Sequence, residues 1–138
     1  DLTKPAAQLE ALAKLEVHYP PNTVITDWSF NSPHSYLRGN MTYQDGKLTV
    51  PATGLYYIYA QLYFHSNGRV NINVNGFTVN IIQPDRSQTD FRGNQYVGGV
   101  FQLNAGDVIT LSPSDWPNTL GTKIFLETKH GYFGVFMI

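Results

Sequence analysis

Cysteine is absent from the 138 residues, which excludes disulfides, thiolate metal sites and cysteine nucleophiles. Charge is also scarce, because 9 Lys and Arg stand against 10 Asp and Glu. This balance gives no electrostatic case for nucleic acid or an acidic membrane surface as a partner. No apolar run approaches the roughly 20 residues of a transmembrane helix, and no signal peptide is visible at Asp1. We therefore expect either a cytosolic protein or an excised extracellular domain, with one domain over residues 1–138.

The patterns of catalytic and metal sites are missing as well. The four histidines, His18, His34, His65 and His130, show no metal-ligand spacing. No nucleophile elbow, phosphate-binding loop or catalytic carboxylate pair is recognisable. We expect no enzymatic activity, no metal site and no cofactor.

The most informative segment that is present runs from Leu55 to Phe64 and reads LYYIYAQLYF. It is short, aromatic-rich and bounded by turn residues, which predicts a β-strand. Alternation puts Tyr56, Ile58 and every second residue after them on one face, and Tyr57, Tyr59 and their alternates on the other. Both faces are largely apolar, whereas a solvated sheet shows one polar face. Another copy of the chain is the simplest cover for the second face.

Further short runs with turns between them predict an all-β sandwich or barrel. Asp45-Gly46 and Asn75-Gly76 are hairpin turn signals. The other expected strands are Ala6 to Glu10, Lys47 to Val50, Val70 to Val74, Phe77 to Ile82, Tyr96 to Leu103, Asp107 to Leu111 and Tyr132 to Ile138.

Three longer segments are expected to be irregular, because they are rich in Pro, Asn, Ser, Asp and Gly: Val17 to His34, Gln83 to Gln95 and Ser112 to Thr122. One alternative stays open near the N-terminus. Leu9, Leu12 and Leu15 could also lie on one side of a short amphipathic helix. We favour the strand.

Four segments in register resemble the tumour necrosis factor ligand family. The signature-like segment is Leu48 to Phe64 (LTVPATGLYYIYAQLYF). The others are Lys4 to Ala7 (KPAA), Tyr96 to Asp107 (YVGGVFQLNAGD) and Gly131 to Ile138 (GYFGVFMI). The resemblance implies a jelly-roll β-sandwich of two antiparallel five-stranded sheets, a homotrimer, and a cytokine-like ligand that binds and clusters cysteine-rich receptors.

The same resemblance implies an extracellular location, secreted or at the cell surface, from a type II membrane precursor. Membrane contact would then come only through an N-terminal anchor outside this sequence. The chain departs from many family members, since it has no cysteine to link the two upper loops. The short connection from His65 to Arg69 also replaces the long insertions of several members.

In the family, one sheet packs around a threefold axis through apolar and aromatic side chains. Carried onto the matching positions, the resemblance implies trimer contacts by Tyr57, Tyr59, Tyr96, Tyr132 and Phe136. Phe101 would join them only if a bulge at Gly98-Gly99 resets the alternation of its strand. The alternative for each single tyrosine is a place in an ordinary monomer core.

Receptors of the family bind in the grooves between subunits. Phe77 lies near a position where several members present a receptor-contacting tyrosine, although it could instead fold back into its hairpin. Trp116, with Asp115 beside it, suits an interface anchor or alternatively a cap on the sandwich end. Arg69 is a candidate rim charge, as are Arg38 and Arg92. Trp28 matches a structural apolar position.

Two other recognition modules remain as alternatives: a jelly-roll carbohydrate-binding domain, which would leave the tyrosines exposed as stacking platforms, and a complement-type globular head. Asn40-Met41-Thr42 is a candidate site for N-glycosylation.

Overall fold

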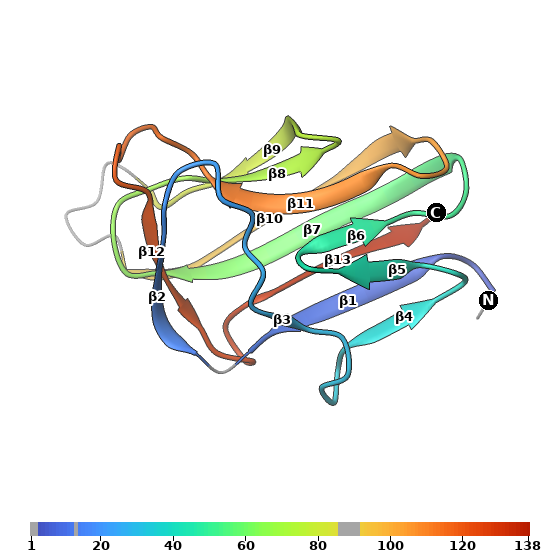
Figure 1. The fold of residues 1–138 in the computed structure, drawn as a ribbon, viewed down its shortest axis with the longest axis horizontal. Coiled ribbons are helices and arrows are strands. Elements are labelled where there is room, and N and C mark those ends of the chain that lie inside the picture. Colours follow the sequence, from blue (N-terminus) through green and yellow to red (C-terminus); the bar gives the residue numbers. More distant parts are fainter. Residues whose placement is uncertain (1–2, 13, 86–91) are drawn as a thin grey trace.

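The computed structural model describes residues 3–12, 14–85 and 92–138, and every regular element in these ranges is a β-strand (Figure 1). The strands are β1 (Ala6–Ala11), β2 (Leu15–Tyr19), β3 (Trp28–Ser29), β4 (Tyr36–Arg38), β5 (Thr42–Gln44), β6 (Lys47–Thr49), β7 (Gly54–Phe64), β8 (Val70–Val74), β9 (Phe77–Ile82), β10 (Gly93–Leu103), β11 (Val108–Pro113), β12 (Thr122–Leu126) and β13 (Tyr132–Met137). Within these ranges, no helix exists that could cross a membrane.

Two antiparallel sheets form a sandwich, which confirms the predicted fold class. One sheet has five strands in the order β5-β6-β11-β8-β9. The other has eight, but several of them share a position. On one side β7 pairs with β10, and on the other side it pairs with both β12 and β13. Next to these, β2 pairs with β12 and β1 pairs with β13. Finally, β3 and β4 both pair with β1. The eight strands therefore fill five positions, as two five-stranded sheets require.

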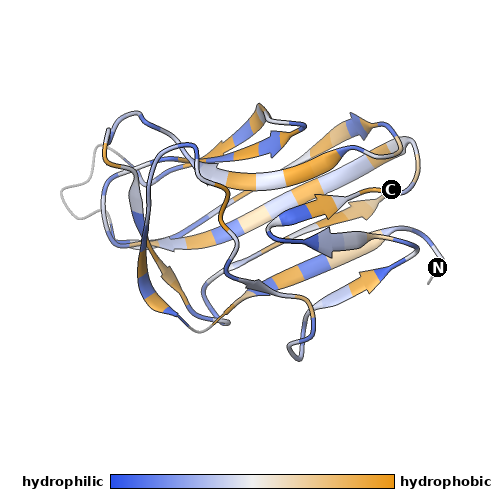
Figure 2. Cartoon of the chain, in the orientation of Figure 1, coloured by the Kyte–Doolittle hydropathy of each residue, from blue (hydrophilic) through white to orange (hydrophobic). Residues whose placement is uncertain are grey.

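The core lies between the sheets and is built by alternation. Along β7, Tyr56, Ile58, Ala60, Leu62 and Phe64 are all fully buried. Figure 2 shows the same alternation as apolar and polar bands along the strands. Because the sheets already share this core, the odd-numbered side chains of β7 point away from it.

The hairpin turns form where the sequence predicts them. Asp45 and Gly46 have φ angles of 49° and 84°, and Asn75 and Gly76 have 52° and 83°. Positive φ at both central residues matches the twist of the flanking strands. The first turn joins β5 to β6, and the second joins β8 to β9.

The favoured strand near the N-terminus is confirmed, because Leu9 is in β1 and Leu15 starts β2, so Leu9, Leu12 and Leu15 do not form the alternative helix. Other segments differ from expectation. The expected irregular segment from Val17 to His34 contains the end of β2 and all of β3. Part of the segment from Gln83 to Gln95, residues 86–91, lies outside the described residues.

Candidate functional site: the open face of the eight-stranded sheet

The candidate site is the side of the eight-stranded sheet that faces away from the core, which we call the open face. Its apolar and aromatic members come from three adjacent strands, β10, β7 and β13. At the centre of this face are Tyr57, Tyr59, Tyr96, Val100, Tyr132 and Phe136. In the single chain Tyr96 and Val100 are each 53% exposed, and Phe136 is 42% exposed.

Strand register explains why these side chains share a face, since residues directly opposite in a ladder point to the same side. Val100 of β10 lies opposite Tyr57, and Phe136 of β13 lies opposite Tyr57 on the other side. Tyr96 and Tyr132 both lie opposite Gln61. The side chains of the open face therefore form one row across the three strands at Tyr57 and a second row at Gln61. A third row, at Tyr59, lies between them.

The middle row has glycine on both sides of Tyr59, namely Gly98 and Gly134. Each glycine receives a tyrosine ring. A Cβ added at Gly98 would collide with the Tyr57 hydroxyl, and one added at Gly134 would collide with the Tyr59 hydroxyl. The two tyrosines therefore lie flat over the sheet in opposite directions instead of projecting from it.

The rings contact one another across this surface. Tyr57 stacks on Tyr59 with centroids 5.8 Å apart, and Phe136 lies 5.4 Å from Tyr57. Tyr132 meets Tyr59 edge to face at 6.2 Å. Together with Gln8 and Tyr36, the rings line a shallow depression of about 450 Å³.

Hydrogen bonds fix the hydroxyl groups of this cluster. The Tyr59 hydroxyl donates to Gln8 Oε1 at 2.6 Å, and the Tyr57 and Tyr96 hydroxyl oxygens are 2.9 Å apart. Burial and the neighbouring hydroxyls raise the pKa of Tyr59 well above its ordinary value. Burial and the hydrogen bond with Tyr57 raise the pKa of Tyr96 to about 12. Tyr59 and Tyr96 therefore keep neutral hydroxyl groups at physiological pH.

Phe101 is not a member of the cluster. The ladder between β7 and β10 runs from Gly93 to Leu103 without a shift in register, so the bulge that Phe101 required is not there. Phe101 lies opposite the buried Tyr56 and packs against the core. Val100 takes the place on the open face. Regular alternation of side chains along the strand, counted from Tyr96, predicts Val100 on this face.

The sequence patterns do not predict that Gln8 and Tyr36 belong to the site, although both help to line the depression. Gln8 lies opposite Tyr36 in the ladder of β1 and β4, and opposite Gly134 in the ladder of β1 and β13. β4 has three residues, which is too short for a period to be visible. No local signal could have placed Tyr36 beside Tyr59.

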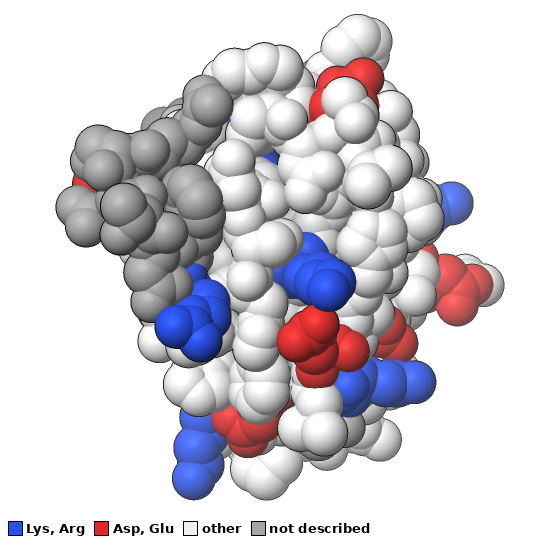
Figure 3. Space-filling view, turned by 90° about the vertical axis from the view of Figure 1, so that its left-hand side faces the viewer, with Lys and Arg blue, Asp and Glu red and all other residues white. Residues whose placement is uncertain are grey.

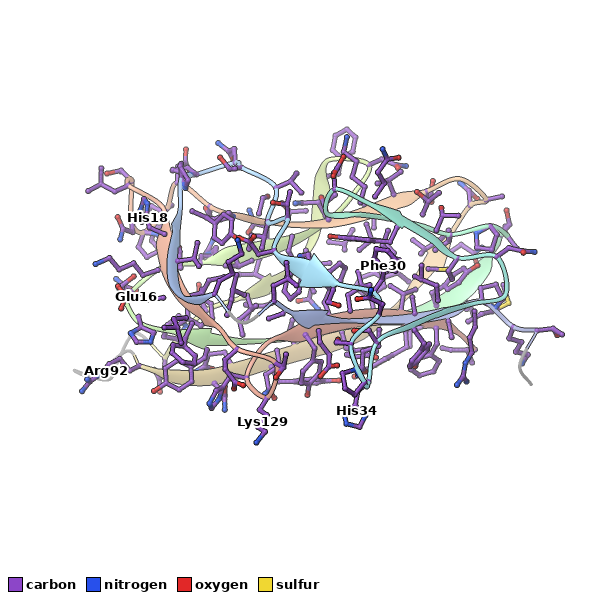
Figure 4. The ribbon with its side chains drawn as sticks, turned by 60° about the horizontal axis from the view of Figure 1, so that its bottom comes forward. Glu16, His18, Phe30, His34, Arg92 and Lys129 are labelled. Atoms are coloured by element: carbon purple, nitrogen blue, oxygen red, sulfur yellow. The ribbon has the colours of Figure 1, made fainter. Side chains whose placement is uncertain are left out.

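The far end of the open face is different in character, because histidines and charged groups join the aromatic rings there. Tyr63, His65, Phe125 and His130 line a second depression of about 290 Å³. His65 Nδ1 is 3.2 Å from a carboxylate oxygen of Glu16. Figure 4 shows Glu16, His18 and Arg92 at this same end of the molecule.

One face of the molecule shows how its charged side chains are distributed (Figure 3). On the face drawn in Figure 3, Lys and Arg alternate with Asp and Glu, without a patch of one sign. Across residues 3–12, 14–85 and 92–138, no three His, Asp or Glu side chains gather in a way that could hold a metal ion.

Three of the expected receptor-contact residues lie together at the loops between β7 and β8 and between β11 and β12. The Arg69 guanidinium lies over the Trp116 ring, 4.5 Å from its centroid, and Arg69 Nε donates to Gln83 Oε1 at 2.9 Å. Trp116 is 50% exposed and Asp115 next to it is exposed. Trp116 thus offers part of its ring to solvent and does not close the sandwich end.

Phe77, the fourth expected contact, lies at the other end of β8. It follows the Asn75-Gly76 turn and is 78% exposed, so it does not fold back into its hairpin. Five residues of β8 separate this turn from Arg69, which is about 17 Å of strand. The structure therefore separates the candidate receptor contacts into two places.

The remaining expected residues have ordinary surroundings. Trp28 is buried, donates from Nε1 to the Ile25 carbonyl and packs edge-on against Phe133, as expected for a structural residue. The Arg38 guanidinium covers the Tyr36 ring at 4.6 Å. Asn40 is exposed in the turn between β4 and β5.

Comparisons with known proteins give one consistent answer. Residues 26–138 match the model of the TNF (Tumour Necrosis Factor) family. The chain is 30% identical over 164 aligned positions to a tumor necrosis factor of Notamacropus eugenii, with 96% of this chain and 68% of that protein covered. It is 29% identical over 132 positions to one of Peromyscus leucopus, with 79% and 54% covered. Among solved structures, that of Eiger TNF from S. frugiperda superposes with a TM-score of 0.77 at 16% identity, over 98% of this chain and 93% of that one.

Proposed function

The chain belongs to the tumour necrosis factor (TNF) family, and on that basis we propose that it is the ligand domain of a trimeric cytokine. As one domain over residues 1–138, it binds cysteine-rich cell-surface receptors of the TNF receptor type and brings receptor chains together. It acts outside the cell, secreted or at the cell surface, from a type II membrane precursor. Its role is recognition and not catalysis.

The main support for the proposed trimer is the open face. In the isolated chain, solvent reaches six apolar and aromatic side chains that lie side by side on three adjacent strands. Contiguous apolar patches on a protein surface commonly mark interaction sites. Closed cyclic symmetry allows identical aromatic groups to meet around an axis, and obligate interfaces of this kind bury roughly 2,000 Å² or more.

The flat placement of Tyr57 and Tyr59 also supports a subunit interface. Because Gly98 and Gly134 receive these rings, the surface is low enough for three copies to approach closely. A carbohydrate platform would need ring faces that stay accessible in the assembled protein. The comparison family favours the ligand over that alternative.

Receptor contact is proposed at Phe77 and at the Arg69–Trp116 pair with Asp115. Exposed aromatic rings are frequent hot spots of protein interfaces, and Arg is frequent beside them. Phe77 and Trp116 both lie outside the open face, so trimer assembly leaves them available.

The experiment has two parts. Sedimentation equilibrium at micromolar concentration should give the trimer mass, and a monomer would refute the trimer. Surface plasmon resonance against a panel of receptor ectodomains should then identify a partner, and a panel of glycans tests the carbohydrate alternative. Binding to glycans without any receptor would overturn the ligand proposal.

Loop variants locate the receptor contact. Phe77→Ala and Trp116→Ala should each weaken receptor binding by about 2 kcal/mol, roughly thirtyfold, with the trimer mass unchanged. Thr119→Ala, at an exposed position of the same loop as Trp116, is the matched control and should bind normally. Unchanged affinity in both aromatic variants would place the contact elsewhere.

A further inference from the structure

We propose that Asn40 carries an N-linked glycan, and that this glycan covers the side of the sandwich where the free edges of the two sheets meet. The proposal rests on the extracellular setting of the proposed function. It does not depend on the trimer or on the receptor.

The chemical basis is a single tripeptide. Asn40-Met41-Thr42 is the one place in the 138 residues where Asn is followed two positions later by Ser or Thr with no Pro between them. The structure presents this tripeptide well. Asn40 and Thr42 are exposed, whereas the side chain of Met41 is buried in the core. The acceptor and the hydroxyl that recognition requires therefore face solvent while the residue between them anchors the turn.

The Asn40 amide is available for modification. Within the described part of the chain, its side chain makes no hydrogen bond, in contrast to Asn75 and Asn118, whose amides are bonded to Asp107 and to the Asn67 carbonyl. An amide nitrogen without a partner has no hydrogen bond to lose when a sugar is attached to it.

The backbone turns Asn40 outward. Gly39 and Asn40 have φ angles of 60° and 69°, in the left-handed region that Gly and Asn tolerate. A Cβ added at Gly39 would lie 2.5 Å from the Thr3 carbonyl oxygen, so the turn rests directly on the N-terminal segment. Figure 1 shows this turn at the end of the molecule where both termini lie.

The position of the turn gives the glycan its role. Asn40 lies in the turn that joins β4, an edge strand of the eight-stranded sheet, to β5, an edge strand of the five-stranded sheet. Edge strands expose unpaired N–H and C=O groups that can pair with another molecule. A bulky, soluble group at the connection between two such edges would hinder this pairing.

The first test is modification itself. The chain is expressed behind a secretory signal in mammalian cells, and its gel mobility is compared before and after treatment with peptide N-glycosidase. We expect a shift in the parent protein, its loss in Asn40→Gln and Thr42→Ala, and its retention in Thr42→Ser. A secreted, folded parent protein without the shift would overturn the proposal.

The second test concerns the edges. Glycosylated protein and the same protein after native enzymatic deglycosylation are compared by light scattering, beside Asn40→Asp made in bacteria, because the enzyme converts Asn to Asp. We expect both glycan-free samples to form species larger than the glycosylated protein forms, increasingly so at higher concentration. Equal scattering by all three samples would refute the covering role. A glycosylated monomer would instead refute the proposed trimer and leave this inference intact.

Discussion

Val100→Asp is the sharpest probe of the open face, because its effects on folding and on assembly are well separated. Val100 is half exposed in the single chain and lies opposite Tyr57 in the ladder of β7 and β10. A carboxylate there stays in water as long as the subunit is alone. The cost to subunit folding is therefore limited to strand preference, which spans about 1 kcal/mol.

Assembly should suffer much more. Loss of a well-buried interface side chain costs about 2 kcal/mol, and the proposed trimer would bring three copies of this side chain to its axis, so it would lose about 6 kcal/mol, roughly four orders of magnitude in its association constant. Desolvation of three unpaired carboxylates adds several kcal/mol for each ion. We expect a folded monomer.

Sedimentation equilibrium measures the assembly, and thermal unfolding followed by circular dichroism checks the fold. Phe77→Asp is the matched control, since it places the same charge at an exposed position of the other sheet. Tyr59→Asp should dissociate the trimer as well, although it also removes contacts within the subunit. If Val100→Asp remains a trimer with the stability of the parent, the open face is not the subunit interface.

Three further outcomes are expected. Gly134→Ala should destabilise the protein by roughly 1–3 kcal/mol in urea unfolding, because its Cβ would displace the Tyr59 ring; an unchanged midpoint would contradict that packing. Burial raises the pKa of Tyr96 to about 12, above the ordinary tyrosine pKa of about 10. The free energy of unfolding should therefore decrease as pH rises from about 10 to about 12. The decrease should be smaller in Tyr96→Phe, which has no hydroxyl to ionise at this position. A hydrogen bond from the Asn104 backbone lowers the pKa of Asp107. The free energy of unfolding should therefore decrease as pH drops from neutral through the acid range, where this carboxylate becomes protonated. The decrease should be smaller in Asp107→Asn.

The sequence predicts the long strands well because their signals are local. The alternation within Leu55 to Phe64 identifies both faces of β7, and Asn75-Gly76 fixes the hairpin of β8 and β9. β3, β4 and β5 have only two or three residues each, so no period is visible in them. β3 and β4 form because the longer strand β1 pairs with them, and β5 forms because the Asp45-Gly46 turn folds it back onto β6.

The candidate site also combines residues that local sequence signals predict with residues that they do not predict. Tyr57 and Tyr59 follow from alternation within one strand, whereas the choice between Phe101 and Val100 depends on whether a bulge interrupts β10. The contact of Arg69 with Trp116 joins two loops that are distant in sequence, and no pattern in either loop announces it. Local signals identify faces, and only tertiary structure identifies neighbours.

The contacts of Arg69 have a consequence for how the protein tolerates its surroundings. One guanidinium stacks on Trp116 and bonds to Gln83, while the Arg69 carbonyl accepts a hydrogen bond from the Ser114 N–H at 2.8 Å, so non-covalent contacts hold three loops together. A thiol reductant has nothing to cleave there. The shape of this end should therefore be the same in a reducing cytoplasm as in an oxidising secretory compartment, since no step of its folding requires an oxidant.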